Sequence, residues 1–314
     1  MNPTSRILLP LRRILQNEFR RKLTSKTAAE PNLNEEPTEV GKSIVVKQTG
    51  PITLFGINRP EKKNSLDTAA ANELSQALDS FEENEECQIG IIHGIGGSFC
   101  AGFDLEEIAK NEVDIDNLPH FGLLSTRNVL TKKPLIASIN GYAVGVGFEL
   151  ALMCDLRIVE EHARMGFLNR RLGIPIMCGG TVRLPAMVGH SRAMDMILTG
   201  REINAEEAFK WGIANRLVAC GAALGQAVSL AQSIIKYPQR PLLADRASLH
   251  YATFGAKPLE EALEFEKDNS TDLLLDEGIK GAKRFVDGFG RHGKSTNITQ
   301  CDRTSFKELN DDML

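Results

Sequence analysis

The sequence lacks any apolar run long enough to cross a membrane, and it has no excess of basic charge. No stretch approaches the roughly 18 consecutive apolar residues that a transmembrane helix needs. The 37 Lys and Arg residues face 41 Asp and Glu residues, a formal net charge of −4, so there is no diffuse basic field for nucleic acid. The 42% hydrophobic and 25% charged content is typical of a globular protein with a sizeable core. We therefore expect no membrane span and no DNA partner, and an RNA partner is disfavoured.

Cysteine is also scarce, with six residues widely spaced in 314 and no CxxC pair. A disulfide scaffold or a zinc site of paired cysteines is therefore disfavoured. The six His residues share no metal-ligand spacing, and the chain has no HExxH, GxSxG or EF-hand pattern. The sequence thus predicts reduced thiols and no catalytic metal. It also lacks the motifs of serine hydrolases and metalloproteases.

The first 28 residues or so are rich in arginine and almost free of acid. They carry seven Lys or Arg residues against one acid, Glu18, and large apolar residues recur every fourth position from Leu11 to Leu23. A polar stretch follows as far as Gly41. This composition is typical of a mitochondrial presequence, and the alternative is a helix on the protein or membrane surface. We expect residues 1–41 to be a presequence and linker, and the protein to reside in the mitochondrial matrix.

The body of the chain, residues 42–293, repeats an order of short apolar strand, loop and helix. The pattern predicts strands at 52–57, 89–93, 135–139, 156–159 and 165–167, and helices near 67–81, 105–110 and 148–155. A mostly helical second half follows, with one helix capped by Ser191 and ended by Gly200, and another begun by an Asn204–Glu207 capping box. Residues 294–314 form a polar tail. This order predicts an α/β fold with buried sheets, in which loops after strands hold ligands.

Two glycine-rich loops each lead directly into a predicted helix. They are SFCAGFDL, residues 98–105, and YAVGVGFEL, residues 142–150. Amides at the start of a helix bind anions, and one amide from each loop would form an oxyanion hole for a carbonyl oxygen on which charge develops. Phe103 and Val146 are the candidate donors. For either loop alone, close packing of helix on strand also explains the glycines.

Glu149 lies in the first turn of the helix that follows the second loop, among apolar neighbours. The helix dipole favours its ionised form, whereas apolar surroundings favour its neutral form. This competition suits a group that both takes and gives a proton near neutral pH. The alternative is a simple acidic residue at a helix start.

The chain from about residue 44 to 292 resembles the crotonase, or enoyl-CoA hydratase/isomerase, superfamily. The resemblance rests, in order, on NRPEKKNSL, SFCAGFDL, NGYAVGVGFELALMCDLRI, GIPIMCGGTVRLPAMVG and LTGREINAEEAFKWGIANRLV. It implies a crotonase-like α/β fold, a spiral of ββα units with a helical C-terminal region that forms homotrimers or dimers of trimers. It also implies coenzyme A thioesters as substrates, in fatty-acid or branched acyl-CoA metabolism. Coenzyme A is then part of the substrate, and no separate cofactor is expected.

The resemblance assigns roles to particular positions. It implies that the N–H groups of Phe103 and Val146 stabilise a thioester enolate and that Glu149 is the catalytic acid and base. Lys62 and Lys63 lie in the segment that resembles the site for the nucleotide part of coenzyme A, and they are available for its phosphates. The other residues expected at the substrate are Ala101, Gly102, Asp104, Gly145 and Arg170.

The sequence departs from the resemblance at the second catalytic position. Hydratases of the superfamily have a second glutamate there, and this chain has Asn169, followed by Arg170 and Arg171. Asparagine can hold a water molecule but cannot remove its proton. Hydration of a 2-enoyl-CoA with Glu149 alone is our favoured reaction.

Three alternatives stay open. One is decarboxylation of a malonyl-type thioester, whose carboxylate Arg170 or Arg171 could receive. Another is isomerisation of an enoyl-CoA with Glu149 as the single shuttling base. The last is a non-catalytic binding protein that kept the fold.

Overall fold

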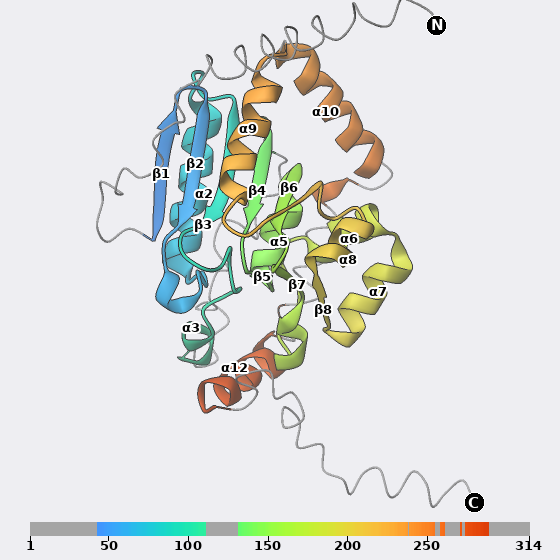
Figure 1. Cartoon of the computed structure of the whole chain (residues 1–314). Helices are drawn as coiled ribbons and strands as arrows, with labels where there is room; N and C mark the ends of the chain where they lie inside the picture. The colour runs from blue at the N-terminus through green and yellow to red at the C-terminus, as the bar shows by residue number, and fades with distance from the viewer. Residues whose placement is uncertain are drawn as a thin grey trace, which may run out of the picture. The chain divides into compact units, whose positions relative to one another are not determined.

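The computed structural model describes residues 43–110, 131–237, 239–254, 258–260, 271 and 274–288. The expected presequence at 1–41 and the expected tail at 294–314 lie outside these residues. Two sheets form the framework (Figure 1), with strand orders β1-β2-β3-β4-β6-β9 and β5-β7-β8. In the larger sheet β1 pairs antiparallel with β2, and the other neighbours are parallel. This arrangement agrees with the predicted α/β fold.

The strands of the larger sheet are β1 (Ile44–Thr49), β2 (Ile52–Ile57), β3 (Ile89–Gly94), β4 (Leu135–Ile139), β6 (Leu156–Glu160) and β9 (Arg216–Val218). Those of the smaller sheet are β5 (Tyr142–Val144), β7 (Arg164–Gly166) and β8 (Glu202–Asn204). The α-helices are α2 (Thr68–Glu83), α3 (Leu105–Lys110), α5 (Val146–Met153), α6 (Gly180–Val188), α7 (His190–Thr199), α8 (Ala205–Lys210), α9 (Ala223–Ile235), α10 (Gln239–Phe254) and α12 (Ile279–Val286). Short 3₁₀ segments are η2 (Pro60–Lys62) and η4 (Leu168–Leu172), and η5 (Leu274–Gly278) is a π-helical turn. No described helix is both long and apolar enough to cross a membrane.

The central strands β2, β3 and β4 of the larger sheet are buried on both faces, whereas the edge strands β1 and β9 are partly exposed. Adjacent side chains of a strand point to opposite faces. Ile91 belongs to the apolar cluster that contains Ala227 of α9, whereas Ile92 belongs to the cluster that contains Leu74 of α2 and Phe148 of α5. Burial on both faces explains why these strands are continuous apolar runs in the sequence. The strand ends are thereby fixed, and the loops that follow them inherit defined positions.

The predicted strands and the three predicted helices of the first half agree with the structure to within two residues at each end. The helix starts in the second half differ. Asn204 caps α8, since its Oδ1 accepts from the N–H of Glu207 at 2.8 Å, but the Glu207 carboxylate binds Arg201, so only half of the capping box forms. The cap predicted at Ser191 is wrong: the N-cap of α7 is Gly189, two residues earlier, and with φ 81° it turns the chain from α6 into α7. Gly200 ends α7 in the left-handed conformation, as predicted.

Candidate functional site

The two glycine-rich loops lie against each other. Val144 N donates to Cys100 O at 3.0 Å, and a Cβ on Gly145 would lie 3.6 Å from the Cα of Gly102. Gly145 has φ 57° and ψ −129°, a conformation that residues with a Cβ avoid. At Gly147 a Cβ would lie 2.2 Å from the carbonyl oxygen of Cys100, so no side chain fits. The glycines therefore allow the contact between the loops.

The backbone directs the N–H of Phe103 away from Leu66. Leu66 N donates to Gly102 O and Asp104 N donates to Leu66 O, both at 2.8 Å. In such a parallel pairing, the N–H of the residue in between points to the opposite side. Val146 is the first residue of α5, so no earlier helical turn supplies an acceptor for its N–H. Both residues line one cavity of about 800 Å³.

The same cavity collects most of the residues expected at the substrate. Glu149, Asn169 and Lys63 line it, as do Ala101, Gly102 and Gly145. Its apolar lining comes from Leu105, Leu168, Leu172, Ile174, Pro175 and Phe285. An apolar pocket with a few convergent polar groups is the usual form of a small-molecule site.

Glu149 is a buried carboxylate held by two backbone amides. Glu149 is only 2% exposed. Its Oε2 accepts hydrogen bonds from Cys178 N at 2.6 Å and from Gly180 N at 2.9 Å. Gly180 is the first residue of α6, so the carboxylate lies at that helix N-terminus. Both the donors and the helix dipole stabilise negative charge and oppose the penalty of burial. Glu149 can therefore act as a base at the cavity.

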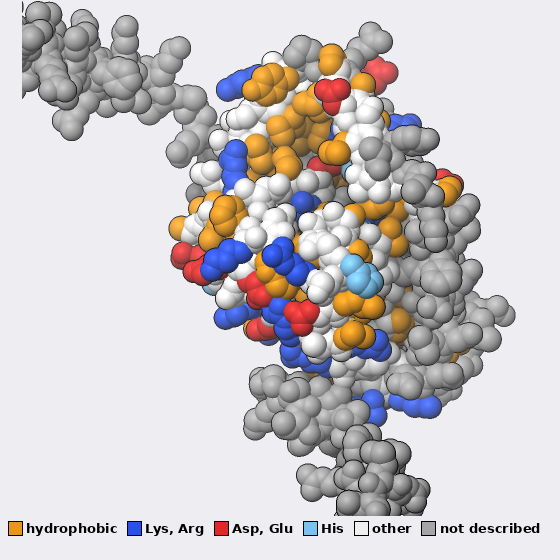
Figure 2. Space-filling model, turned by 90° about the vertical axis from the view of Figure 1, so that its right-hand side faces the viewer, with side chains coloured by type: hydrophobic (Ala, Val, Ile, Leu, Met, Phe, Trp, Pro, Cys, Tyr) orange, Lys and Arg blue, Asp and Glu red, His pale blue; other side chains and the backbone are white. Residues whose placement is uncertain are grey.

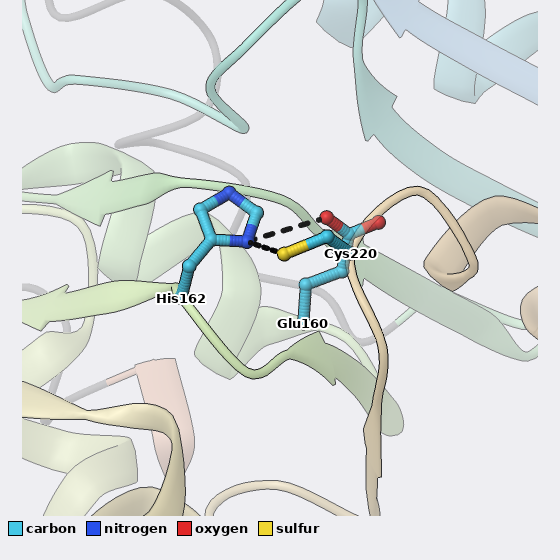
Figure 3. A group of neighbouring side chains, drawn as sticks. All are labelled: Glu160, His162 and Cys220. Atoms are coloured by element: carbon cyan, nitrogen blue, oxygen red, sulfur yellow. Dashed lines mark hydrogen bonds and ion pairs between the residues drawn. The ribbon is translucent and has the colours of Figure 1, made fainter.

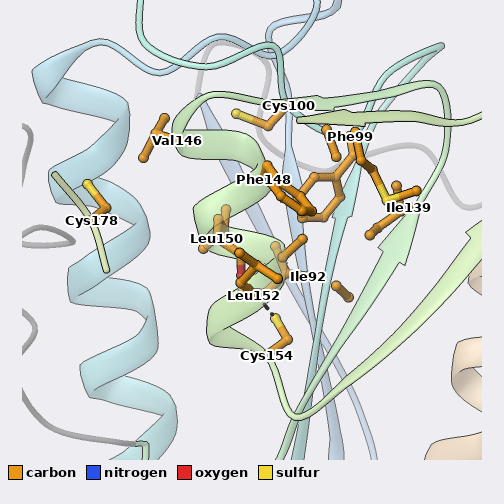
Figure 4. Packing of buried hydrophobic residues seen from close by; sticks show 14 of the residues in the cluster. Ile92, Phe99, Cys100, Ile139, Val146, Phe148, Leu150, Leu152, Cys154 and Cys178 are labelled. Carbon is orange, nitrogen blue, oxygen red and sulfur yellow. Dashed lines mark hydrogen bonds between the residues drawn. The ribbon is translucent and has the colours of Figure 1, made fainter. Parts of the chain in front are cut away.

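Packing of α5 fixes where this helix begins. Phe148 is fully buried, and its ring centroid lies 5.1 Å from that of Phe167. Figure 4 shows Phe148 directed toward Phe99, while Val146 lies on the opposite side of α5. The apolar side of the helix is thus anchored in the core, and its first turn faces the cavity.

Asn169 lines the cavity, and the backbone fixes the orientation of its amide group. Its Nδ2 donates to Ile174 O at 2.9 Å and to Pro175 O at 3.1 Å. Because both partners are acceptors, the NH₂ group and not the oxygen of the amide must face them, and the orientation of the amide is fixed. Oδ1 is buried and, within the described part of the chain, has no hydrogen-bond partner. It lies 3.9 Å from where a Cβ of Gly145 would be, beside the second loop.

Lys62 and Asp104, both expected at the substrate, lie outside the cavity lining and bind each other. Lys62 Nζ is 2.7 Å from Asp104 Oδ2, and the Arg59 guanidinium binds the same oxygen at 3.1 Å. The hydrogen bond to Asp104 raises the pKa of Lys62. Burial acts to raise the pKa of Asp104, but the hydrogen bonds from Lys62 and from the N–H of Glu106 outweigh it and leave the pKa lowered. This pair joins the 59–67 segment to the first loop.

The two arginines after Asn169 differ in position. Arg170 is exposed and does not line the cavity, whereas Arg171 does, with its Nε donating to Gly200 O at 3.1 Å. Lys63 and Tyr142 also line the cavity. Lys63 Nζ lies 5.0 Å from the ring centroid of Tyr142.

The sequence reasoning missed the amides of Cys178 and Gly180, because a backbone donor has no side-chain signature. The glycine pair that begins α6 was the available signal, since it repeats the pattern of the two recognised loops.

Comparison with known proteins gives consistent matches. A model of the enoyl-CoA hydratase/isomerase family matches residues 47–289. The chain is 35% identical over 256 residues to a probable mitochondrial enoyl-CoA hydratase of Dictyostelium discoideum, covering 80% of this chain and 85% of that protein. It is 31% identical over 255 residues to a carnitinyl-CoA dehydratase of Citrobacter koseri, covering 79% and 97%. A carnitinyl-CoA hydratase from Mycobacterium avium has a similar structure, with a TM-score of 0.70, 30% identity and coverage of 79% and 97%.

Proposed function

The chain belongs to the enoyl-CoA hydratase/isomerase family, and from this premise we propose that it adds water to a 2-enoyl-CoA thioester and catalyses the reverse dehydration. The observation that carries the proposal is the meeting of Phe103, Val146, Glu149 and Asn169 in one cavity. The thioester oxygen accepts hydrogen bonds from the N–H groups of Phe103 and Val146. These donors stabilise the negative charge that develops on that oxygen as the enolate forms.

Glu149 serves as base and then as acid within one turnover. It takes a proton from water while the water oxygen bonds to C3 and the electrons of the double bond move toward the thioester oxygen. It then returns this proton to C2 as the carbonyl re-forms, so one water is added and no proton is left over. Asn169 Oδ1 accepts the other O–H of the water and orients it, since an amide cannot remove the proton.

The remaining lining supports a coenzyme A thioester. The apolar side chains contact the acyl chain, and Lys63, one of the cationic residues that line the cavity, binds a phosphate of the nucleotide part. The reaction needs no cofactor beyond the coenzyme A of the substrate.

We place the protein in the mitochondrial matrix, supported by the composition of residues 1–41 and by the mitochondrial relative of Dictyostelium discoideum. A fusion of residues 1–41 to a fluorescent protein should be imported into mitochondria. A fusion that stays in the cytosol contradicts this location.

A second candidate reaction is decarboxylation of a malonyl-type thioester, because Arg171 lies in the cavity wall. A guanidinium there can bind the substrate carboxylate. Carbon dioxide would then leave, and the same two N–H groups would hold the enolate.

Turnover assays separate the two reactions. The purified protein should convert crotonyl-CoA to 3-hydroxybutyryl-CoA, and Glu149→Gln should lower kcat by about 10²- to 10⁴-fold, because glutamine cannot exchange the proton. Glu206→Gln, on the exposed face of α8, is the matched control and should leave kcat unchanged. Release of carbon dioxide from methylmalonyl-CoA without hydration supports the second candidate. Absence of turnover with any acyl-CoA contradicts both.

A further inference from the structure

A second group of chemically versatile side chains lies where β6 and β9 end. Glu160, the last residue of β6, pairs with Val218, the last residue of β9. His162 follows β6 and Cys220 follows β9, just before α9 begins. Because neighbouring parallel strands end at the same edge of a sheet, residues separated by 58 positions meet there (Figure 3). None of the three lines the cavity described above.

The three side chains offer ligand atoms at metal-site distances. Cys220 Sγ is 3.0 Å from His162 Nδ1, which is 3.6 Å from Glu160 Oε2, and all three atoms lie within 4.8 Å of one another. Around a tetrahedral zinc ion, sulfur, nitrogen and oxygen ligands stand about 3.4 to 3.6 Å apart. The distances from His162 Nδ1 to its two partners each differ from these values by about half an ångström or less.

The backbone already orients this group. Ala223 N, at the start of α9, donates to Glu160 Oε1 at 3.1 Å. Glu160 is buried, so its other oxygen is held toward His162. Figure 3 shows Nδ1 of His162 turned toward both partners, with the second ring nitrogen pointing away. Groups that orient metal ligands in this way raise the affinity of a site.

We propose that Glu160, His162 and Cys220 bind one Zn²⁺ per chain, with water as the fourth ligand on the exposed side. Thiolate, imidazole and carboxylate are the ligands that zinc takes in proteins. Bound there, the ion links the end of β6 to the segment that follows β9, two strands that pair over only three residues. The three ligands lie outside the cavity lining, so the ion takes no part in the proposed reaction.

A reactive thiol is the competing interpretation of the same group. Desolvation and the carboxylates of Glu161 and Glu160 raise the pKa of the Cys220 thiol, which opposes formation of a free thiolate nucleophile. A dication balances the same negative charges. No sequence motif marks the site, because Cys220 is 58 positions away from His162 in the sequence.

Cobalt binding tests the proposal without any activity assay. The full-length protein, freed of metal with a chelator, is titrated with Co²⁺ and then with Zn²⁺. We expect one Co²⁺ per chain, with the near-ultraviolet thiolate-to-cobalt charge-transfer band and visible bands of tetrahedral cobalt, and displacement by one Zn²⁺. Zn²⁺ should also raise the Tm, because it binds only the folded chain. Failure of the wild-type protein to bind, or a spectrum without the thiolate band, overturns the proposal.

Variants locate the bound metal. Cys220→Ser should remove the charge-transfer band, and both Cys220→Ser and His162→Ala should weaken binding by roughly a hundredfold or more, because each removes a ligand. Each should also abolish the Zn²⁺-dependent rise in Tm. Cys301→Ser and His190→Ala are the matched controls and should bind as wild type does. Retention of wild-type binding by Cys220→Ser and His162→Ala places the metal elsewhere and overturns the proposal.

Discussion

The side-chain amide of Asn169 is held by two backbone carbonyl oxygens, which fixes its orientation. Nδ2 donates to the carbonyl oxygens of Ile174 and Pro175, and the acceptor Oδ1 is buried and has no hydrogen-bond partner within the described part of the chain. A glutamate at this position would extend further and could remove a proton from water. In the proposed hydration, the shorter amide instead leaves all proton transfer to Glu149.

Asn169→Asp should be destabilising although the two side chains have nearly the same shape. A carboxylate would face two carbonyl oxygens without a proton to share, so we expect the free energy of unfolding at neutral pH to fall by about 1 to 3 kcal/mol. Asn204→Asp is the matched control, because Asn204 accepts a hydrogen bond as a helix cap and aspartate caps equally well. Urea unfolding of the three proteins measures the difference. An Asn169→Asp variant as stable as wild type would contradict the anchoring described here.

The residues of the site differ in how well they could be predicted from the sequence. Glu149 could be predicted because an acidic residue among apolar neighbours is costly to bury. Phe103 and Val146 could be predicted because each follows a glycine near the start of a helix. Lys62 and Lys63 could not be told apart, since only the fold shows that Asp104 binds the first and that the second lines the cavity. Arg170 and Arg171 were equally indistinguishable, because the turn of η4 decides which of them lines the cavity.

At the scale of elements, α12 closes one side of the cavity. It packs with α3 in a small apolar cluster that includes Ile108, Ile174 and Ile279, and Phe285 of α12 lines the cavity. Gly281 brings the helix against η4: a Cβ there would lie 1.5 Å from the carbonyl oxygen of Leu172. The segment that carries Asn169 and Arg171 is thus supported directly by α12.

Gly281→Ala should therefore push α12 away from η4. Overpacking of this kind lowers the free energy of unfolding by about 1 to 3 kcal/mol, and we expect the KM for the acyl-CoA to rise because Phe285 and η4 shift together. Lys280→Ala, at an exposed neighbouring position of the same helix, should leave both quantities near wild type. Steady-state kinetics and urea unfolding measure them. An unchanged KM in Gly281→Ala would show that α12 does not shape the site.

Helix α10 is connected to the larger sheet through Asp155, which follows α5. Asp155 Oδ1 accepts from Arg246 Nε at 2.7 Å and lies 3.3 Å from His250 Nε2, while Oδ2 accepts from Leu135 N at 2.8 Å. Burial acts to raise the pKa of Asp155, but the hydrogen bonds from His250 and Arg246 outweigh it, and the pKa is lowered. The ionised form is therefore favoured by folding.

The lowered pKa gives a pH-dependent stability with a defined sign. The contribution of Asp155 is complete above the unfolded-state pKa of about 3.9 and is lost as the pH falls through the lower folded-state value. Asp155→Asn should reduce the free energy of unfolding by about 3 kcal/mol at neutral pH, and the difference from wild type should shrink below about pH 4. Asp245→Asn, exposed on α10, is the control. A difference that does not depend on pH would contradict this assignment.

Elements with a strong apolar pattern were predictable, and those defined by pairing were not. Strands β3 and β4 are buried on both faces and were visible as short β-branched runs. The three-residue strand β8 contains two polar residues and exists because it pairs with β7, so no pattern within it could predict a strand. The start of α7 was misplaced because a positive φ at Gly189, not the Ser191 hydroxyl, sets it.

At the scale of the whole molecule, several large apolar side chains of the second half are exposed. They are Met194 and Leu198 of α7, Phe209 of α8, Leu249 of α10, and Tyr237 between α9 and α10. Figure 2 shows hydrophobic side chains among charged ones on the side where Figure 1 places α7, α8 and α10. Exposed apolar surface of this kind is typical of subunit contacts.

We expect a homotrimer or a dimer of trimers. Sedimentation equilibrium at micromolar concentration should give three or six chains, and Leu198→Glu should dissociate the assembly because a charge would be buried at the contact. Val46→Glu, at a comparably exposed site on β1, should leave the assembly intact; the two side chains are 70% and 51% exposed. A monomer of the wild-type protein under these conditions contradicts the expectation.

The position of the thioester oxygen is the most direct test of the proposed function. A crystal structure of the protein with a bound 3-hydroxyacyl-CoA should place that oxygen about 3 Å from both Phe103 N and Val146 N, with the Glu149 carboxylate facing the carbon atoms that exchange the proton and the hydroxyl. A thioester bound elsewhere in the cavity, or N–H groups of Phe103 and Val146 directed away from it, would contradict the proposal.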